Sequence, residues 1–269
     1  MSSPATTADR TALVTGASSG IGAALAREIA MDQYDLVLTA RREERLQNLA
    51  EELEATHGVT ATVITQDLAA EKAGEELFEA VTNEGIEIHT LVNNAGVPLY
   101  GRFDETELED ERDIMEVNMV ALTSLTKRFL RPMVKRGEGR ILNTASMAAL
   151  YPIPKKAVYS GTKSYVLSFS RALGHELDGS GVTVTAVCPG VVETEYANRG
   201  NVEKSNTLAG VTNDPRSVAQ AAWEGAKDGE RIVFPSLHSK YGSQLVRLLP
   251  RSKVTELGES TVEDGASWI

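Results

Sequence analysis

Tyr159 and Lys163 are the two side chains whose types and spacing point most directly to proton chemistry. They lie four residues apart in an amphipathic stretch, so on a helix they share one face about one turn apart. A phenol normally loses its proton at about pH 10, and a neighbouring ammonium stabilises the phenolate and lowers that pKa. The pair predicts a tyrosine that acts as general acid or base near neutrality. Pairs with this spacing also arise by chance on exposed helices.

Ser146 is a second polar side chain with a possible part in such chemistry. It lies thirteen residues before Tyr159, just past an apolar, β-branched run. A serine hydroxyl at a strand end can hydrogen-bond a substrate carbonyl, and it can also serve simply as a turn residue.

A glycine-rich turn follows the first apolar run of the chain and leads into an alanine-rich stretch. The turn reads Thr15-Gly16-Ala17-Ser18-Ser19-Gly20-Ile21-Gly22. Between a strand and a helix, such a turn presents backbone N–H groups at a helix N-terminus, where they hold a pyrophosphate. Its spacing differs from the commoner G-x-G-x-x-G pattern. We expect a dinucleotide site here, with a plain tight turn as the alternative.

Arg41 and Arg42 follow the second apolar run, where an NAD-binding fold carries an acidic residue for the ribose 2′-hydroxyl. Guanidinium groups instead pair with a 2′-phosphate through two charge-assisted bonds. The arginines therefore predict NADP(H) as the preferred cofactor, with NAD(H) possible. The alternative is that both begin a solvated helix face.

Two further polar segments follow predicted strands. The segment Asn93-Asn94-Ala95-Gly96 closes the fourth strand, at the sheet edge where open α/β sheets bind ligands. It could also be a turn that caps a helix. Asp67, after the third strand, could hold the adenine edge or could cap the next helix.

Apolar runs alternate with longer amphipathic stretches along the chain. We predict strands over Thr11–Thr15, Leu36–Ala40, Thr60–Thr65, Thr90–Asn93, Arg140–Ala145, Val182–Val187 and Arg231–Phe234. Helices are expected near Ile21–Met31, Glu43–His57, Ala70–Glu84, Glu107–Lys135, Ala157–Leu177 and Pro215–Asp228. Strict alternation predicts a doubly wound, Rossmann-type α/β fold with a seven-stranded parallel sheet and helices on both faces. Asp214 is expected to cap the last helix, with Pro215 in its first position.

No change in composition marks a second domain, so we expect a single domain over residues 11–249. Residues 191–213 are polar and lie between a strand and a capped helix, which suggests a lid over the site. Residues 1–10 and 250–269 are expected to be tails, and Trp268–Ile269 could dock against a partner subunit or be loose.

The motifs, taken together and in order, resemble those of the short-chain dehydrogenase/reductase family over about residues 11–234. The matching motifs are Thr15–Gly22, Asn93–Gly96, Asn118, Ser146, Tyr159 to Lys163, and Pro189–Gly190 with Thr194 beyond. The resemblance implies hydride transfer between the nicotinamide and a carbonyl carbon, with the catalytic residues Asn118, Ser146, Tyr159 and Lys163.

Each of these positions has a role that the resemblance implies. Tyr159 would give its proton to the carbonyl oxygen, and Ser146 would steady that oxygen. Lys163 would hold the nicotinamide ribose and lower the Tyr159 pKa, while Asn118 would position a water that relays protons from solvent. Thr194 and the backbone of Val191 and Val192 would hold the carboxamide end of the cofactor.

The cofactor site is expected to draw on all these segments. Its predicted residues are Gly16, Ser18, Ser19, Gly20, Ile21, Gly22, Arg41, Arg42, Asp67, Asn93, Ala95, Gly96, Tyr159, Lys163, Pro189, Gly190, Val192 and Thr194. One departure from the family pattern is Ser19, where some NADPH-using members carry a basic residue. Arg41 and Arg42 would therefore hold the 2′-phosphate without that help.

Composition limits the partners. The formal net charge of −11 disfavours attraction to nucleic acid or to an anionic membrane, and the first ten residues lack the apolar run of a signal peptide. Cys188 is the single cysteine and has no Cys/His neighbours, so we expect no metal site and a reducing cytoplasm. The resemblance implies a homodimer or homotetramer formed through the helices at 107–135 and 157–177.

The residues expected around the substrate are mostly apolar or aromatic. They are Leu99, Tyr100, Met147, Leu150, Tyr151, Pro152 and the segment 192–208. They favour a hydrophobic ketone, aldehyde or 3-oxoacyl substrate, or the matching secondary alcohol, over a sugar or a small charged acid. Two rival functions are a non-enzymatic NADPH sensor, which would not need the tyrosine and lysine, and a nucleotide-sugar epimerase or dehydratase, for which the region after Pro189 is short.

Overall fold

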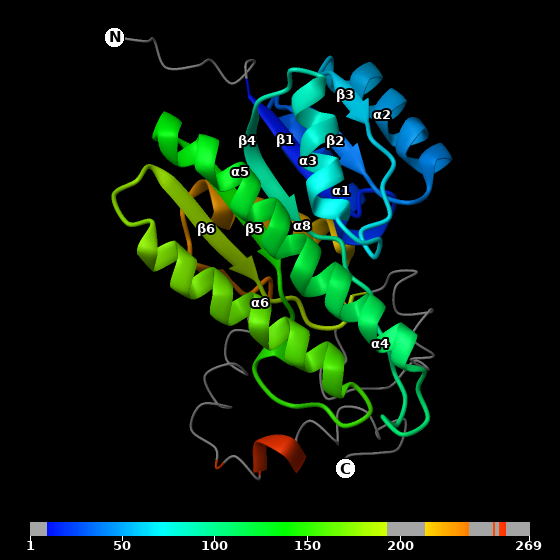
Figure 1. The fold of residues 1–269 in the computed structure, drawn as a ribbon. Helices are drawn as coiled ribbons and strands as arrows, with labels where there is room; N and C mark the ends of the chain where they lie inside the picture. Colours follow the sequence, from blue (N-terminus) through cyan, green and yellow to red (C-terminus); the bar gives the residue numbers. More distant parts are fainter. Residues whose placement is uncertain (1–9, 193–212, 237–249, 251–252, 257–269) are drawn as a thin grey trace.

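The computed structural model describes residues 10–192, 213–236, 250 and 253–256 (Figure 1). Its centre is a seven-stranded sheet whose neighbouring strands all pair in parallel, in the order β3-β2-β1-β4-β5-β6-β7. The strands are β1 (Thr11–Thr15), β2 (Asp35–Thr39), β3 (Ala61–Val63), β4 (Ile88–Asn93), β5 (Gly139–Thr144), β6 (Val182–Val187) and β7 (Ile232–Val233). The expected Rossmann-type α/β fold is confirmed.

Helices cover both faces of this sheet. They are α1 (Gly20–Met31), α2 (Glu43–His57), α3 (Ala73–Asn83), α4 (Leu108–Met115), the π-helical η2 (Glu116–Ala121), α5 (Leu122–Arg136), the 3₁₀ turn η3 (Met147–Ala149), α6 (Ala157–Glu176) and α8 (Pro215–Lys227). Figure 1 shows α3, α5 and α6 on the face turned to the viewer. Among the described residues, no helix has the length and apolar character needed to cross a membrane.

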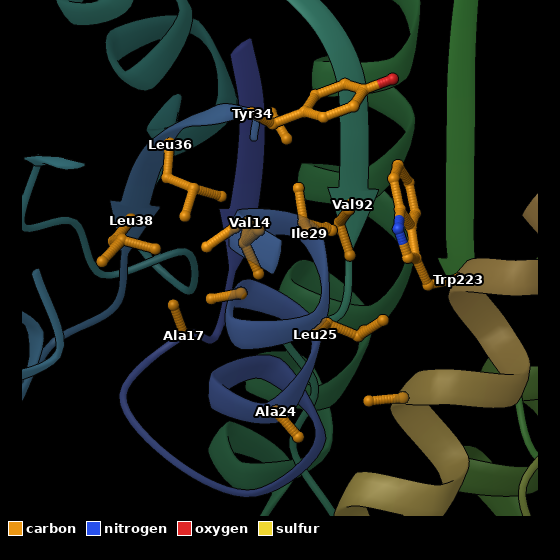
Figure 2. Close-up of a cluster of buried hydrophobic side chains, with 14 of the residues drawn as sticks. Val14, Ala17, Ala24, Leu25, Ile29, Tyr34, Leu36, Leu38, Val92 and Trp223 are labelled. Atoms are coloured by element: carbon orange, nitrogen blue, oxygen red, sulfur yellow. The ribbon is translucent and has the colours of Figure 1, made fainter. Parts of the chain in front are cut away.

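The alternation of side chains along each strand divides the core between the two faces. Val14 of β1 packs with Ile29 of α1 and Trp223 of α8 in one cluster (Figure 2). Leu13, the preceding residue of β1, points to the other face and packs with Phe129 of α5. Both faces of the sheet are therefore buried, which accounts for the continuous apolar runs in the sequence.

The boundaries of several elements differ from the sequence prediction. The helix expected at Ala70 begins at Ala73, because the Asp67 carboxylate accepts a hydrogen bond from the Ala69 N–H and Lys72 has a φ of 65°, which together form a turn before α3. At the sheet edges, β3 and β7 are shorter than expected: β3 spans three residues and β7 two. Edge strands have a neighbour on one side alone, which limits how far they pair.

The long helix expected over 107–135 contains a π-helical segment. Leu108–Met115 and Leu122–Arg136 are α-helical, and Glu116–Ala121 between them is wider. Such a widening inserts one residue into the i to i+4 pattern, so apolar periodicity alone does not reveal it. Asn118 lies within this segment, and π-helical turns often occur at functional sites.

The predicted cap of the last helix is confirmed. The Asp214 carboxylate accepts from the Ser217 N–H at 3.2 Å, and Pro215 occupies the first position of α8. Just before this cap, the two ends of the predicted lid meet, since Asn213 N–H donates to the Val191 carbonyl at 2.9 Å. Residues 193–212 of the lid, including Thr194, lie outside the described residues, as do residues 1–9 and Trp268–Ile269.

Candidate active site

The carboxyl ends of β1 and β4 form a switch point of the sheet, because β1 lies between β2 on one side and β4 on the other. Ligands of open α/β sheets bind in the crevice at such a point. The glycine-rich turn leaves the sheet after β1, and the segment Asn93–Gly96 leaves it at the end of β4. The structure thus brings these two predicted cofactor segments to one place.

The glycine-rich turn has little room for side chains. Gly16 and Gly20 have φ angles of 68° and 57°, a region that disfavours side chains. A Cβ on Gly22 would lie 2.2 Å from the Gly16 carbonyl oxygen and 2.5 Å from Asn94 Nδ2. Ser19, at the N-cap of α1, makes no side-chain cap hydrogen bond. A backbone cradle at an uncapped helix start fits the pyrophosphate of a dinucleotide.

Hydrogen bonds of Thr15 and Asn94 fix this turn against the neighbouring strands. Thr15 Oγ1 donates to the Val92 carbonyl and accepts from the N–H groups of Asn94 and Ala95, at 3.2, 2.9 and 3.0 Å. Asn94 Nδ2 donates to the Thr15 carbonyl at 3.1 Å. Thr144 Oγ1 donates to Asn94 Oδ1 at 3.3 Å. The ends of β1, β4 and β5 are therefore held in register around the crevice.

Lys163 is buried at the centre of this edge. Its side chain is 3% exposed, and its Nζ donates to the Thr144 carbonyl at 2.8 Å. The same Nζ lies 5.9 Å from the centroid of the Tyr159 ring. Burial lowers the pKa of Lys163 to about 8, so at pH 7 the ammonium is still largely charged. The structure brings the predicted lysine and tyrosine together on α6.

Asn118 links the π-helical segment to the turn after β4 and to α6. Its Oδ1 accepts from the Val97 N–H at 3.0 Å, and its Nδ2 donates to Thr162 Oγ1 at 3.0 Å. Thr162 Oγ1 in turn donates to the Tyr159 carbonyl at 2.8 Å. Asn118 is 1% exposed, so it has the buried, hydrogen-bonded setting of a residue that fixes the start of α6.

Ser146 follows β5 and caps the short turn η3. Its Oγ accepts from the Ala148 N–H at 3.1 Å, which matches the turn role. The next residue, Met147, donates its N–H to the Pro189 carbonyl at 2.9 Å, so the turns after β5 and β6 lie together. Among the described residues the Ser146 hydroxyl proton has no acceptor, which leaves it able to donate to a ligand.

Arg42 lies against the glycine-rich turn. Its Nη2 donates to Ser18 Oγ at 3.1 Å and to Ser19 Oγ at 2.7 Å. Arg41 is about half exposed, and its Nη1 lies 3.8 Å from the Asp67 carboxylate. Arg42 therefore lies beside the uncapped start of α1, and Arg41, the residue before it, has the Asp67 carboxylate nearby.

The Asn93 side chain does not face the crevice freely. Its Nδ2 donates to Thr126 Oγ1 at 3.0 Å and to Asn143 Oδ1 at 2.9 Å, and the residue is 3% exposed. Asn143 Nδ2 continues the chain of bonds to Ser170 Oγ on α6. The NH2 group of Asn93 is therefore engaged inside this network, while Oδ1 is buried and has no hydrogen-bond partner among the described residues.

Comparison with known proteins decides the family. Residues 10–205 match the family model described as short chain dehydrogenase. The chain belongs to the short-chain dehydrogenase family. It is therefore an oxidoreductase that acts on carbonyl or alcohol groups.

Several relatives cover most of this short-chain dehydrogenase. A putative ketoacyl reductase of Streptomyces coelicolor is 41% identical, over 72% of this chain and 74% of its own. A 3-oxoacyl-(acyl-carrier-protein) reductase of Vibrio cholerae is 32% identical, over 88% and 98%. A solved short-chain dehydrogenase of Sphingobium yanoikuyae, in complex with NADPH, is 31% identical with a TM-score of 0.80, over 89% and 93%.

Some residues of the short-chain dehydrogenase site were not singled out from the sequence. The Thr144 carbonyl, which holds Lys163, and the Thr162 hydroxyl, which holds Asn118, are examples. A backbone carbonyl carries no sequence signal, and Thr162 lies unmarked between Tyr159 and Lys163. Their roles depend on contacts between elements that are distant in the chain.

Proposed function

We propose that this protein is an NADPH-preferring carbonyl reductase or alcohol dehydrogenase for hydrophobic ketones, aldehydes or 3-oxoacyl compounds. The observation that carries the proposal is that the buried ammonium of Lys163 lies over the Tyr159 ring, with Nζ 5.9 Å from the ring centroid. This pair lies at the sheet edge that also carries the glycine-rich turn. A phenol beside a buried cation can exchange a proton with a carbonyl oxygen.

The preference for NADPH rests on charge at the start of α1. No acidic residue ends β2, where an NAD site would need one, and Arg42 reaches Ser18 and Ser19 beside the glycine-rich turn. Arg41, the residue before Arg42, is about half exposed. Solved relatives from Sphingobium yanoikuyae and an actinorhodin polyketide ketoreductase are complexes with NADPH, which supports the same choice.

The remaining cofactor contacts fall along the same edge. The backbone of Gly16 to Gly22 would hold the pyrophosphate, and Ala95 and Gly96 would border the ribose. Pro189, Gly190, Val192 and Thr194, together with Lys163, would hold the nicotinamide end. Bound there, the cofactor would supply the hydride.

The protein's own side chains would manage the proton. Tyr159 would donate its hydroxyl proton to the carbonyl oxygen as that oxygen gains negative charge, and the Ser146 hydroxyl would donate a hydrogen bond to the same oxygen. Lys163 would hold the phenolate in its charged form. Asn118 would fix the start of α6 and position a water on the path of the returning proton.

The apolar lining supports a hydrophobic substrate. Leu99, Tyr100, Met147, Leu150 and Tyr151 are all partly exposed along the turns after β4 and β5. Relatives carry names of ketoacyl reductases and of a bulky-bulky ketone specific alcohol dehydrogenase, whose substrates are of this kind. Such side chains favour binding by apolar contact around one or two directed hydrogen bonds.

The first test follows NADPH consumption through the nicotinamide absorbance at about 340 nm, with hydrophobic ketones, aldehydes and 3-oxo esters as substrates. Tyr159→Phe should abolish turnover and retain NADPH affinity, because it removes the proton donor and little else. Turnover by Tyr159→Phe comparable with that of the wild type would remove this tyrosine from the mechanism.

The second test concerns the cofactor. Arg41→Ala and Arg42→Ala should each lower kcat/KM for NADPH by about 10-fold or more while changing that for NADH much less, as expected for loss of a charge-assisted contact. An unchanged NADPH/NADH ratio in both variants would contradict the assignment of the 2′-phosphate site.

We also propose a cytoplasmic homodimer or homotetramer. Val120 on η2 and Val134 on α5 are 51% and 41% exposed, which suits a face covered by a second copy. Light scattering of the purified protein would check this, and a monomer at micromolar concentration would contradict it.

A further inference from the structure

A small cavity lies beside Tyr159, on the side of the turn that follows β4. Its volume is about 50 Å³, and its lining includes Leu99, Phe103, Glu111, Lys155, Lys156 and Tyr159. Since one water takes up about 30 Å³ in the liquid, the space suits a group the size of a carboxylate. The catalytic chemistry described above uses neither lysine.

Lys156 is a charged group without a countercharge in the described part of the chain. It is partly buried, and burial lowers its pKa from the usual value. Within the described ranges it forms no ion pair and no side-chain hydrogen bond, and its Nζ lies over the Tyr100 ring, 5.9 Å from the ring centroid. A desolvated ammonium of this kind gains most from an anionic partner.

The other groups around the cavity leave it with an excess of positive charge. The one carboxylate that lines it, Glu111, accepts a hydrogen bond from Thr106 Oγ1 at 2.8 Å and, within the described ranges, forms no ion pair with either lysine. Two lysines and one carboxylate therefore line the cavity, and the carboxylate is already engaged. The first residues of α6, Ala157 to Tyr159, also line the cavity, and no side chain caps their N–H groups.

The backbone at Lys155 holds this arrangement. Lys155 has a φ of 61°, a strained value for a residue with a side chain, and its carbonyl accepts from the Gly101 N–H at 2.9 Å. This turn starts α6 directly after Lys156 and joins it to the loop after β4. Lys155 itself is exposed, so its charge is screened by solvent.

We propose that this cavity binds an anionic group, such as a carboxylate, on the carbonyl substrate, with Lys156 as its counterion. The inference rests on the proposed function and narrows its substrate class to apolar carbonyl compounds that carry a nearby anion. Lys156 immediately precedes α6, Tyr159 lies in the first turn of that helix, and both line the cavity. The anion would therefore sit a few bonds from the carbonyl carbon.

The test compares 4-oxopentanoate with its methyl ester, which share a carbon skeleton and differ in charge. For the wild type we expect kcat/KM with NADPH to favour the acid by about 10- to 100-fold, the range of a hydrogen bond to a charged group. Lys156→Gln should cut this ratio about 10-fold or more by raising KM for the acid. Lys156→Arg should keep the ratio, and Lys155→Gln, which removes the neighbouring exposed charge, should keep it as well.

A binding measurement separates this inference from the proposed function. Calorimetric titration of the NADP⁺-loaded protein with the acid and the ester requires no turnover. Tighter binding of the acid that is lost in Lys156→Gln supports the anion site even if no carbonyl is reduced. Turnover of the ester with no preference for the acid, or a preference that survives Lys156→Gln, would overturn the anion site and leave the carbonyl reductase standing.

Discussion

Replacement of Lys163 by methionine tests how strongly the structure disfavours the charge at the centre of its site. Methionine fills a similar volume without a charge. Lys163 is 3% exposed, and burial lowers its pKa from 10.5 to about 8. The protein thus keeps an ammonium in a place that opposes it, as is common for groups tuned for catalysis. Lys163→Met should abolish turnover.

The pKa shift sets the size of the effect on stability. Each pKa unit corresponds to about 1.4 kcal/mol, so a shift from 10.5 to about 8 amounts to about 3 kcal/mol. This free energy disfavours the charged form of Lys163 in the folded state. Lys163→Met removes the unfavourable charge, which raises the free energy of unfolding, and it also removes the hydrogen bond to the Thr144 carbonyl, which lowers it. A neutral amine makes the same hydrogen bond, so the contribution of this bond depends little on pH.

The direction with pH follows from proton binding. Between pH 8 and 10.5 the unfolded chain keeps the Lys163 proton and the folded chain releases it. The titration of Lys163 therefore makes the free energy of unfolding of the wild type rise across this pH window. Lys163→Met has no titrating group at this position. The difference between the two free energies of unfolding, variant minus wild type, should therefore fall by about 3 kcal/mol between pH 7.5 and 10.5.

Urea unfolding at 25 °C and one protein concentration would measure this difference at several pH values. Burial raises the pKa of Cys188 to about 12, so this thiol lowers stability as pH rises from 9 toward 12. It does so in both proteins, and its contribution largely cancels in the difference. Lys127→Met, at an exposed position, is the control and should show a small, nearly constant difference. A difference for Lys163→Met that stays constant within about 0.5 kcal/mol would refute the reasoning.

Two other substitutions follow from the geometry. Ser146→Ala removes the hydroxyl that caps η3 in the turn after β5. It should lower kcat about 10²-fold with little change in NADPH affinity, measured by steady-state kinetics, and a normal rate would leave Ser146 as a turn residue. Gly22→Ala would place a Cβ 2.2 Å from the Gly16 carbonyl oxygen. It should weaken NADPH binding and lower the free energy of unfolding, each by about 3 kcal/mol. Gly161→Ala, with open space around its Cβ, should instead stabilise α6 by about 0.5–1 kcal/mol in the same urea assay; a loss at Gly161 as large as at Gly22 would contradict the steric argument.

The sequence by itself determined the fold and the order of its elements. Local pattern suffices for this, because buried parallel strands read as apolar runs and their crossover helices have a different period. The spacing of Tyr159 and Lys163 also needed no tertiary information, since both lie on one helix. The cap at Asp214 is equally local and was predicted correctly.

Tertiary structure decided what each polar side chain contacts. The Asn93 side chain donates to Thr126 on α5 and to Asn143 on β5, and no local pattern encodes these contacts. The π-helical turn around Asn118 likewise breaks the helical period over too few residues to be seen in a sequence. The surroundings of Lys156 also depend on tertiary structure. Folding brings the loop after β4 against the start of α6, and it leaves the Lys156 ammonium partly buried without a countercharge in the described part of the chain. Burial and pairing are properties of segments that meet from distant parts of the chain, and for that reason the three-dimensional structure alone reveals them.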